Sequence, residues 1–308
     1  MNKQHYAIFS CKGLGDGLIS LILAHNLVQE GHEATLFHPF LQELQGWFPH
    51  IPIRPLAEAT EDYDHFFFFY EKLPPLEPLL RAYEKKFKEK ICVLNPIATT
   101  NTDYPYWENG QFDGHIPFVD NLYYFCKRTL SLSAPTKKNG ICIPTHLIKN
   151  KYPNRVIIHP TSSRNGKNWS PKKYISLAKK LEKVGFTPAW ILTPQEQALW
   201  PVHAETFSSL SDLASYIYES GVMIGNDSGI GHLASCLGLR TLTICRNADS
   251  ARFWRPAWTQ GYVLTPPKWL PNLKGLRYRD KYWQTTISVR NVLKTFHRMV
   301  MEDRAFLR

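Results

Sequence analysis

The sequence has few cysteines, and none are spaced as a metal site or a disulfide framework would need. Its six cysteines are scattered along 308 residues without a C-x-x-C pair, which favours reduced thiols in a cytosol. No run approaches the ~18 consecutive apolar residues of a membrane-spanning helix, and no charged region followed by an apolar core resembles a secretory signal. We therefore expect a cytoplasmic protein that touches a membrane at most peripherally.

Acidic residues are also scarce relative to basic ones. The chain has 26 Asp and Glu against 37 Lys and Arg, a formal net charge of +11 at pH 7. This charge favours an anionic partner, such as nucleic acid, an acidic membrane surface or a phosphorylated substrate. The length of 308 residues is sufficient for two domains of ordinary size.

Two common nucleotide-binding signatures are missing. The first loop, 13–17, has the spacing G-x-G-x-G instead of G-x-G-x-x-G, and no acidic residue ends the next apolar strand at 34–37, which argues against a nicotinamide cofactor. The loop 160–169 is not the G-x-x-x-x-G-K-[ST] loop of nucleotide-hydrolysing motors. Asp62-Tyr63-Asp64 resembles a D-x-D metal motif, but it leads directly into the apolar strand 66–70, and we interpret it as structural.

What the sequence does contain is a repeated alternation of short apolar strands with helices. The strands are predicted at 6–10, 34–37, 66–70, 156–159, 190–192, 222–224 and 242–245. This alternation is typical of doubly wound α/β folds, whose ligand sites lie at the carboxyl ends of the strands. From these patterns we predict a first domain over 1–147, a second over 148–287 and a terminal amphipathic helix over 288–308.

The stretch 221–240 is the clearest strand–turn–helix unit. Its strand ends at Gly225, residues 226–229 form a turn, and helical spacing begins near His232. Such a turn directs free backbone N–H groups and the positive end of a helix dipole outward, which suits a pyrophosphate. On this pattern alone, an ordinary turn in which Asp227 and Ser228 cap the helix explains the residues equally well.

Three other polar residues each allow a structural and a functional interpretation. Asp16 is a helix cap or a general base at the mouth of a cleft, and the local pattern favours the cap. Lys167 lies in a loop of hydroxyls and glycine that can hold phosphate, although a single lysine is by default a surface residue. Glu196 is an ordinary first-turn acid or an acceptor of hydrogen bonds from ribose hydroxyls.

Four motifs in order resemble glycosyltransferase family 9, the bacterial lipopolysaccharide heptosyltransferases and their relatives. They are Gly15-Asp16, then His159-Pro160-Thr161-Ser162 with Lys167-Asn168-Trp169-Ser170-Pro171, then Glu196 after the following strand, then Asn226-Asp227-Ser228-Gly229-Ile230-Gly231-His232-Leu233-Ala234. The resemblance covers most of the chain. It implies a GT-B fold, with two Rossmann-like doubly wound domains facing each other across a cleft and the last helix packed back on the first domain.

The resemblance also implies the chemistry. It predicts an inverting, metal-independent glycosyltransferase with no cofactor beyond a nucleotide-sugar co-substrate, by default ADP-heptose. Asp16 would take the proton of the acceptor hydroxyl, with Lys12 and Gly15 on the acceptor side and Ser208, a donor-side residue, bordering this base.

The remaining implied residues belong to the donor site. They are Lys167, Thr161, Ser162, Ser228 and Gly229 for the leaving diphosphate, Glu196 for the ribose and Asp227 for the donor sugar. His232 would either hold the turn in place or reach a phosphate, and we favour the holding role.

One loop departs from the family. Where members read G-P-T-(D/N)-P, residues 245–249 read Cys-Arg-Asn-Ala-Asp, which leaves the identity of the donor open. The net charge fits an anionic glycolipid or glycan acceptor at the inner face of a bacterial inner membrane.

Two further classes of function stay open at this point. One is a non-catalytic GT-B module that binds an anionic glycan or scaffolds glycan assembly. The other is a nucleic-acid binder, suggested by the cations and aromatics that alternate over 246–255. We favour the transferase, with no nucleic-acid partner.

Overall fold

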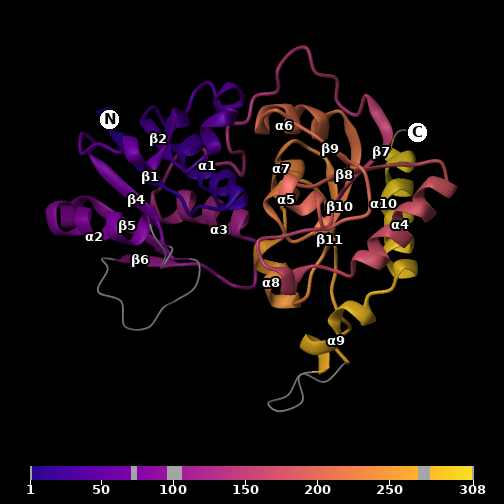
Figure 1. The fold of residues 1–308 in the computed structure, drawn as a ribbon. Coiled ribbons are helices and arrows are strands. Elements are labelled where there is room, and N and C mark those ends of the chain that lie inside the picture. The colour runs from indigo at the N-terminus through magenta and orange to yellow at the C-terminus, as the bar shows by residue number, and fades with distance from the viewer. Residues whose placement is uncertain (1, 71–74, 96–105, 270–277, 307–308) are drawn as a thin grey trace. The chain divides into compact units, whose positions relative to one another are not determined.

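The computed structural model describes residues 2–70, 75–95, 106–269 and 278–306. The chain forms two compact units, Met1–Pro144 and Thr145–Arg308 (Figure 1). The sequence places the boundary after residue 147, within the same stretch between the last helix of the first unit and the first strand of the second.

The N-terminal unit is built around one parallel sheet. Its described part has six strands in the order β3-β2-β1-β4-β5-β6. The strands are β1 (His5–Phe9), β2 (Glu33–Phe37), β3 (Ile53–Arg54), β4 (His65–Phe69), β5 (Ile91–Asn95) and β6 (Tyr106–Gln111). The helices are α1 (Leu14–Gln29), α2 (Leu76–Phe87) and α3 (Phe118–Tyr124). Short 3₁₀ helices lie at Leu41–Trp47, Leu56–Glu58 and Lys88–Lys90, and a π-helical turn lies at Phe125–Thr129.

Aromatic residues hold this sheet to its helices. Phe9 of β1 stacks on Phe37 of β2 and Phe68 of β4, with ring centroids 4.9 and 4.3 Å apart. Tyr83 of α2 meets the edges of Phe9 and Phe66. Central parallel strands are covered on both faces and therefore read as continuous apolar runs, which is why β4 could be predicted from four consecutive phenylalanines.

The C-terminal unit has a second parallel sheet. Six strands in its described part follow the order β12-β11-β10-β7-β8-β9. They are β7 (Tyr152–His159), β8 (Thr187–Ile191), β9 (Ala204–Glu205), β10 (Ser220–Asn226), β11 (Arg240–Ile244) and β12 (Tyr262–Leu264). The helices are α4 (Pro171–Lys183), α5 (Pro194–Gln197), α6 (Leu210–Tyr218), α7 (Gly229–Cys236), α8 (Ala248–Trp254), α9 (Tyr278–Thr286) and α10 (Val289–Phe306), with a single helical turn at Asn165–Lys167.

Each sheet has a point where the strand order changes direction. In the N-terminal unit it lies between β1 and β4, and in the C-terminal unit between β7 and β10. Loops leaving adjacent strands in opposite directions separate at such a point, so a ligand can bind at the carboxyl ends of those strands. The strand order therefore singles out the loops after β1, β7 and β10.

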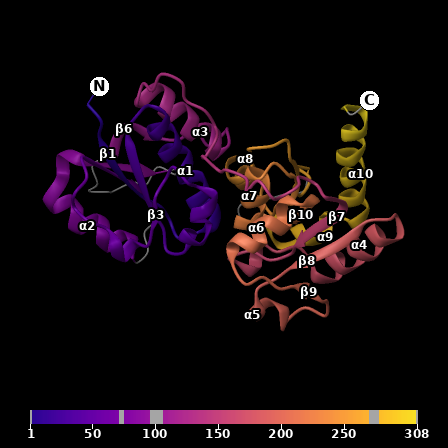
Figure 2. The same cartoon turned by 90° about the horizontal axis from the view of Figure 1, so that it is seen from above.

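The terminal helix contributes to the core of the C-terminal unit. Its buried residues Val292, Phe296 and Met299 belong to the core of the C-terminal unit, together with Trp169 and Trp283. Figures 1 and 2 both show α10 beside α4. Within the described residues the apolar face of α10 is buried in the C-terminal unit, and the packing of 288–308 on the N-terminal domain stays a prediction.

This packing predicts how truncating one buried side chain of α10 changes the stability of the fold. Phe296 is fully buried and its ring meets the edge of Phe186 at 4.8 Å. Phe296→Ala should lower the free energy of unfolding by about 3–5 kcal/mol, measured by urea unfolding. Met301, which is 62% exposed, supplies the control, and Met301→Ala should change stability by less than about 0.5 kcal/mol.

Hydrogen exchange locates the loss. Amide protection in the Phe296→Ala variant should fall in β7 and β10 and stay unchanged in β1 and β4. Loss of protection centred on β1 and β4 would contradict this placement of α10.

Candidate functional site

The donor-side residues proposed from sequence all lie at one edge of the C-terminal sheet. Because its strands are parallel, their carboxyl ends share that edge. Thr161, Ser162 and Lys167 follow β7, Glu196 follows β8, Ser208 follows β9, and Asp227, Ser228, Gly229 and His232 follow β10. The loops after β7 and β10 flank the change in strand direction, so seven of these nine residues gather at that point.

Asn226 connects these two loops. Its side chain is 1% exposed. Its Oδ1 accepts hydrogen bonds from the Trp169 backbone N–H at 3.1 Å and the Tyr174 hydroxyl at 3.0 Å, and its Nδ2 donates to the Pro160 carbonyl. One buried amide at the end of β10 thus fixes both ends of the 160–169 loop.

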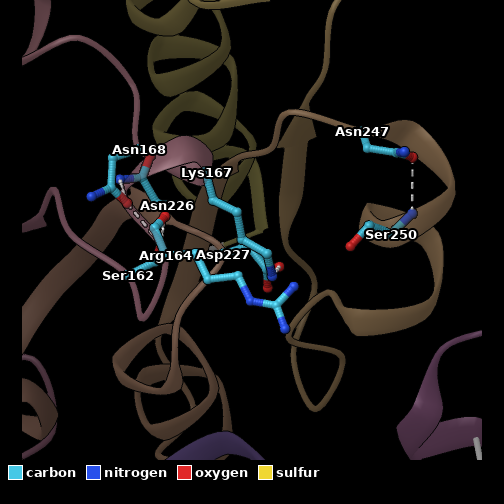
Figure 3. A network of polar contacts seen from close by, with 8 residues as sticks. All are labelled: Ser162, Arg164, Lys167, Asn168, Asn226, Asp227, Asn247 and Ser250. Atoms are coloured by element: carbon cyan, nitrogen blue, oxygen red, sulfur yellow. Dashed lines mark hydrogen bonds and ion pairs between the residues drawn. The ribbon is translucent and has the colours of Figure 1, made fainter. Parts of the chain in front are cut away.

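A second amide extends this network into the loop itself (Figure 3). Asn168 Oδ1 accepts a hydrogen bond from Ser162 Oγ at 2.7 Å and lies 3.4 Å from Asn226 Nδ2. Ser162 also donates to the Arg164 carbonyl at 3.1 Å. The hydroxyl of Ser162 therefore shapes the loop, a role that the sequence did not suggest.

Lys167 and Asp227 form an ion pair between the two loops. Lys167 Nζ lies 3.3 Å from Asp227 Oδ2. The side chain of Asp227 is 13% exposed and that of Lys167 is 36% exposed. The carboxylate is therefore held in a largely buried position by a cation that still reaches solvent.

Two arginines add positive charge to this region. Arg164 extends toward the same side of the network as Lys167 and Asp227 in Figure 3. Arg246 lies in the loop after β11, and a Cβ placed on Gly166 would come within 3.7 Å of Arg246 Nη1. Neither arginine has an ion-pair partner among the residues that the structure describes. Sequence reasoning named neither as a site residue, and the departure from the family loop at 245–249 was the signal for Arg246.

The N-terminus of α7 is open. Ser228 is its N-cap, but no side-chain hydrogen bond caps the helix. By contrast, Thr193, Ser209 and Asn247 cap α5, α6 and α8, and Figure 3 shows the cap from Asn247 to Ser250. The first N–H groups of α7 lack partners within the helix, so this end is available to an anion.

Two hydroxyls near this helix end are buried without partners. Within the described parts of the chain, neither Thr161 Oγ1 nor Ser228 Oγ has a hydrogen-bond partner. An unsatisfied buried hydroxyl costs ~1–3 kcal/mol, and a bound ligand would remove this cost. From the sequence, Thr161 was proposed as a donor-site residue for its hydroxyl and Ser228 for its backbone N–H.

His232 binds the end of α8 through one ring nitrogen, and its other ring nitrogen has no hydrogen-bond partner in the described structure. Its ring is buried, makes a hydrogen bond to the Trp254 carbonyl and meets the edge of the Trp258 ring at 6.0 Å. Burial lowers the pKa of His232, against the opposing effects of Asp227 and the Trp254 carbonyl. The neutral ring leaves Nδ1, which has no partner in the described structure, as an acceptor. An acceptor nitrogen can bind a hydroxyl but not a phosphate oxygen.

Glu196 and Ser208 both have local structural roles. Glu196 and Thr193 form a reciprocal cap on α5, with Thr193 N–H donating to Glu196 Oε2 at 2.8 Å and Glu196 N–H donating to Thr193 Oγ1 at 3.3 Å. Ser208 is exposed and donates to the Asp212 carboxylate. Glu196 thus matches the structural interpretation of a first-turn acid. Burial lowers the pKa of His159, and the nearby Glu196 carboxylate opposes part of that shift.

In the N-terminal unit, Asp16 lies in the first turn of α1. This helix follows β1, one of the two strands between which the strand order changes direction. A Cβ placed on Gly13 would come within 2.2 Å of Asp16 Oδ2, so the carboxylate folds back over the glycine at the N-cap. Ser20 Oγ donates to the Asp16 carbonyl and to Ser10 Oγ, both at 2.9 Å, which ties this turn to the end of β1. Lys12 is exposed and Gly15 is buried on either side of Gly13.

A buried histidine that the sequence did not indicate supports this loop. His38 follows β2 and is fully buried. Its Nδ1 accepts hydrogen bonds from the N–H groups of Phe40 and Leu41, at 3.3 and 3.2 Å, and its Nε2 lies 3.2 Å from the Gly13 carbonyl. Because Nδ1 accepts twice, Nε2 carries the proton and donates to Gly13. Burial lowers the pKa of His38 to about 4.

The two other sequence features considered earlier are structural in the described residues. Asp64 Oδ2 accepts a hydrogen bond from the His5 N–H at 2.9 Å. In the segment 246–255, Phe253 is buried and Arg252 pairs with Asp249 at 3.6 Å. Among the residues described, no group of three or more His, Cys, Asp or Glu side chains could hold a metal ion.

Comparison with known proteins shows which family the segment that carries this edge of the sheet is similar to. Residues 145–272 match the model of glycosyltransferase family 9 (heptosyltransferase). This segment is a family 9 glycosyltransferase domain. It contains the loops after β7 and β10, and Asp16 lies outside it. No curated protein is significantly similar to the chain in sequence.

Solved structures extend the likeness to both units. The heptosyltransferase WaaC of E. coli with ADP superposes with a TM-score of 0.68 at 13% identity, over 96% of this chain and 98% of that one. The E. coli ADP-heptose lipopolysaccharide heptosyltransferase II gives 0.63 at 14% identity, over 97% and 99%. A family 9 glycosyltransferase from Veillonella parvula gives 0.63 at 14% identity, over 97% of each chain.

The fold of the chain is therefore GT-B, as the motif order predicted. The predicted likeness to glycosyltransferase family 9 is confirmed for residues 145–272, which the family model matches. None of the helices in the described part of the chain is long and apolar enough to cross a membrane.

The environment of His38 predicts a pH dependence. A folded-state pKa of about 4 lies below the ordinary 6.5, so the neutral ring stabilises the fold above pH 6.5, and this contribution is lost as the pH falls toward 4. For the wild type, this His38 contribution should lower the free energy of unfolding by about 3 kcal/mol between pH 7 and pH 4. The His38→Gln variant, whose amide can still donate and accept, should lack this decrease. The measurement is the difference in urea-unfolding free energy between the two pH values.

Exposed His146 provides the control, and His146→Gln should keep the pH dependence of the wild type. Equal pH dependence in the wild type and His38→Gln would contradict the assignment of a neutral, loop-supporting histidine.

Proposed function

We propose that the protein is an inverting, metal-independent glycosyltransferase that moves a sugar from a nucleoside diphosphate sugar, by default heptose from ADP-heptose, onto a lipopolysaccharide core or a related bacterial surface glycan. The proposal makes the C-terminal unit the donor side. It makes the N-terminal unit the acceptor side.

The observation that carries the proposal is the open end of α7 beside two orphaned hydroxyls. Thr161 Oγ1 and Ser228 Oγ are buried without partners in the described structure, and the first N–H groups of α7 are uncapped. Helix N-termini of this kind bind phosphate through their N–H groups and dipole. A diphosphate would satisfy all of these groups at once.

Cations would balance the charge of the departing diphosphate. Lys167 is already paired with Asp227, so its net contribution to an anion is reduced. Arg164 and Arg246 have no such partner among the described residues, and Arg246 approaches the loop at Gly166. In this proposal these three side chains supply the positive charge that other transferases obtain from a divalent metal.

The sugar and ribose would use the hydrogen-bond acceptors of the site. Asp227 is an acceptor for sugar hydroxyls, and the neutral Nδ1 of His232 is another. Glu196 keeps one carboxylate oxygen for a ribose hydroxyl while the other caps α5. Ser208 is assigned to the donor side near the base. Relatives of known structure contain ADP, which supports adenosine as the nucleoside.

The reaction would then need one base. The acceptor oxygen attacks the anomeric carbon from the face opposite the diphosphate, its proton passes to the Asp16 carboxylate, and the bond to the diphosphate oxygen breaks. Lys12 and Gly15, beside Asp16, are assigned to the acceptor. The net charge of +11 suits an anionic glycolipid acceptor and a peripheral contact with the cytoplasmic face of the inner membrane.

A non-catalytic glycan-binding module is the second candidate. The replacement of the family loop at 245–249 favours it, because that loop follows β11 and borders the donor edge. Arg246 argues against this second candidate. Its guanidinium approaches the proposed phosphate-binding loop at Gly166 and would add to donor binding.

Two substitutions separate the proposed roles. Asp16→Asn should lower the rate of sugar transfer by about 10²- to 10⁴-fold and leave the donor dissociation constant unchanged. Lys167→Ala should raise that dissociation constant by about tenfold, because it removes a cation and leaves the Asp227 carboxylate uncompensated. Transfer is measured by release of nucleoside diphosphate, and binding by isothermal calorimetry.

Exposed residues of the same kind serve as controls. Glu89→Gln and Lys172→Ala should match the wild type in both measurements. If Asp16→Asn transfers sugar at the wild-type rate, Asp16 is not the base. If both site variants lose donor affinity alike, the division of roles is wrong.

The donor can be identified without an acceptor. Thermal stability is measured against ADP, UDP, GDP and their sugars, with EDTA present. A ligand at 100 times its dissociation constant should stabilise the fold by ~2.7 kcal/mol. A selective shift with ADP compounds is expected, a shift with UDP or GDP compounds would change the donor, and no shift with any of them would favour the non-catalytic module.

A further inference from the structure

Large aromatic side chains are exposed together at one place in the C-terminal unit. Trp269 is 79% exposed, Tyr278 is 47% exposed and Tyr282 is 43% exposed. Two of them belong to α9, and Trp269 follows the last strand of the sheet. A tryptophan side chain exposed to this extent leaves most of its apolar area in water, which favours a partner surface that can cover it.

Basic side chains lie among these aromatics. Arg279 Nη2 donates to the Lys268 carbonyl at 2.6 Å, which joins the segment ending at Trp269 to the start of α9. Tyr278 and Tyr282 stack on each other with centroids 5.9 Å apart, and Lys281 Nζ lies 5.3 Å from the centre of the Tyr282 ring. We call Lys268, Trp269, Tyr278, Arg279, Lys281 and Tyr282 the α9 surface.

The charge of the α9 surface is positive. Lys268, Arg279 and Lys281 stand against one acidic residue of α9, Asp280. This local excess is larger in proportion than that of the chain as a whole, and it coincides with the exposed aromatics.

We propose that the α9 surface binds an anionic phospholipid bilayer. Tryptophan and tyrosine favour the interface between lipid headgroups and hydrocarbon, where the ring is covered and its polar atom stays wet. Lysine and arginine beside them attract acidic lipids, at about 1 kcal/mol for each basic residue near the membrane. The inference deepens the membrane contact suggested under the proposed function by assigning it to six residues.

The ring geometry favours lipid over single-stranded nucleic acid. Bases bind proteins by stacking on the open faces of aromatic rings. Here Tyr278 and Tyr282 face each other, and Lys281 lies over the ring of Tyr282. The edges and hydroxyls of the tyrosines remain for headgroups.

The α9 surface is also fixed to the donor loop. Trp283, the next residue of α9, is 3% exposed in the core, and Gln284 Nε2 donates to the Asn168 carbonyl at 2.7 Å. Lys173 Nζ donates to the carbonyls of Gln284 and Ile287, at 2.5 and 2.8 Å. A membrane bound to this surface would therefore stand at a set distance from the 160–169 loop.

The test is binding of the full-length protein to vesicles, measured by flotation. Phosphatidylcholine vesicles are compared with mixed phosphatidylcholine–phosphatidylglycerol vesicles. The wild type should bind the mixed vesicles and not the neutral ones. Lys268→Glu/Lys281→Glu should weaken binding by about 25-fold or more, because two basic residues are reversed, and Trp269→Ala should weaken it measurably at constant charge.

Matched controls make the result specific. Lys179→Glu/Lys183→Glu imposes the same charge change on exposed lysines of α4, and Leu199→Ala removes an apolar side chain that is 82% exposed. Both controls should bind as the wild type does. Equal loss in the α4 variant would overturn the assignment, since net charge alone would then explain binding. A wild type that binds a single-stranded oligonucleotide but no vesicle would also overturn it.

Donor binding is measured in the same variants by thermal shift. It should be unchanged, because the six residues of the α9 surface are not among those assigned to the donor site. A wild type that binds its nucleotide but no anionic vesicle would overturn this inference and leave the transferase intact. Failure of every nucleotide, with vesicle binding preserved, would overturn the transferase alone.

Discussion

Asn226 is buried at the end of β10, where its amide must satisfy both donor and acceptor groups or destabilise the fold. It accepts from Trp169 and Tyr174 and donates to the Pro160 carbonyl. An aspartate of the same shape could accept the first two bonds, but it would set a charged oxygen against that carbonyl. The loop after β7 therefore takes its position from β10, and the hydroxyls and cations that it carries depend on this amide.

The charges at this edge stabilise Asp227 and still leave a net positive charge. A largely buried Asp227 without a partner would be costly, and Lys167 removes that cost. The pair is close to neutral, so under the proposed function the attraction for a diphosphate would come mainly from Arg164, Arg246 and the open end of α7. Under the proposed function, this arrangement would let a chain that lacks the usual family loop after β11 keep a cationic donor edge, because Arg246, which stands where the family pattern has a proline, approaches the loop at Gly166.

Local patterns in the sequence were enough to predict seven of the twelve strands in the described residues and the shared edge of the donor residues. Longer apolar runs mark the buried central strands, whereas short strands such as β3, β9 and β12 carry too few residues to show a pattern. Partners distant in the sequence could not be predicted. The apolar face of α10 is visible in the sequence, but the surface that buries it is not. His38 and Arg246 act through contacts with Gly13 and Gly166, and no spacing rule connects those positions.

The position of Lys173 shows why α9 and α10 belong to the donor side. The last carbonyls of a helix have no partners within it, and a cation there is favourable. Lys173, at the start of α4, supplies that cation to the Gln284 and Thr285 carbonyls in the last turn of α9 and to the Ile287 carbonyl after it, and burial lowers its pKa. Trp169 Nε1 donates to the Ile287 carbonyl at 3.1 Å from the other side. Trp169, at the end of the 160–169 loop, and Lys173, shortly after it, thus bind the α9–α10 junction, so the terminal helices and this loop hold each other in position.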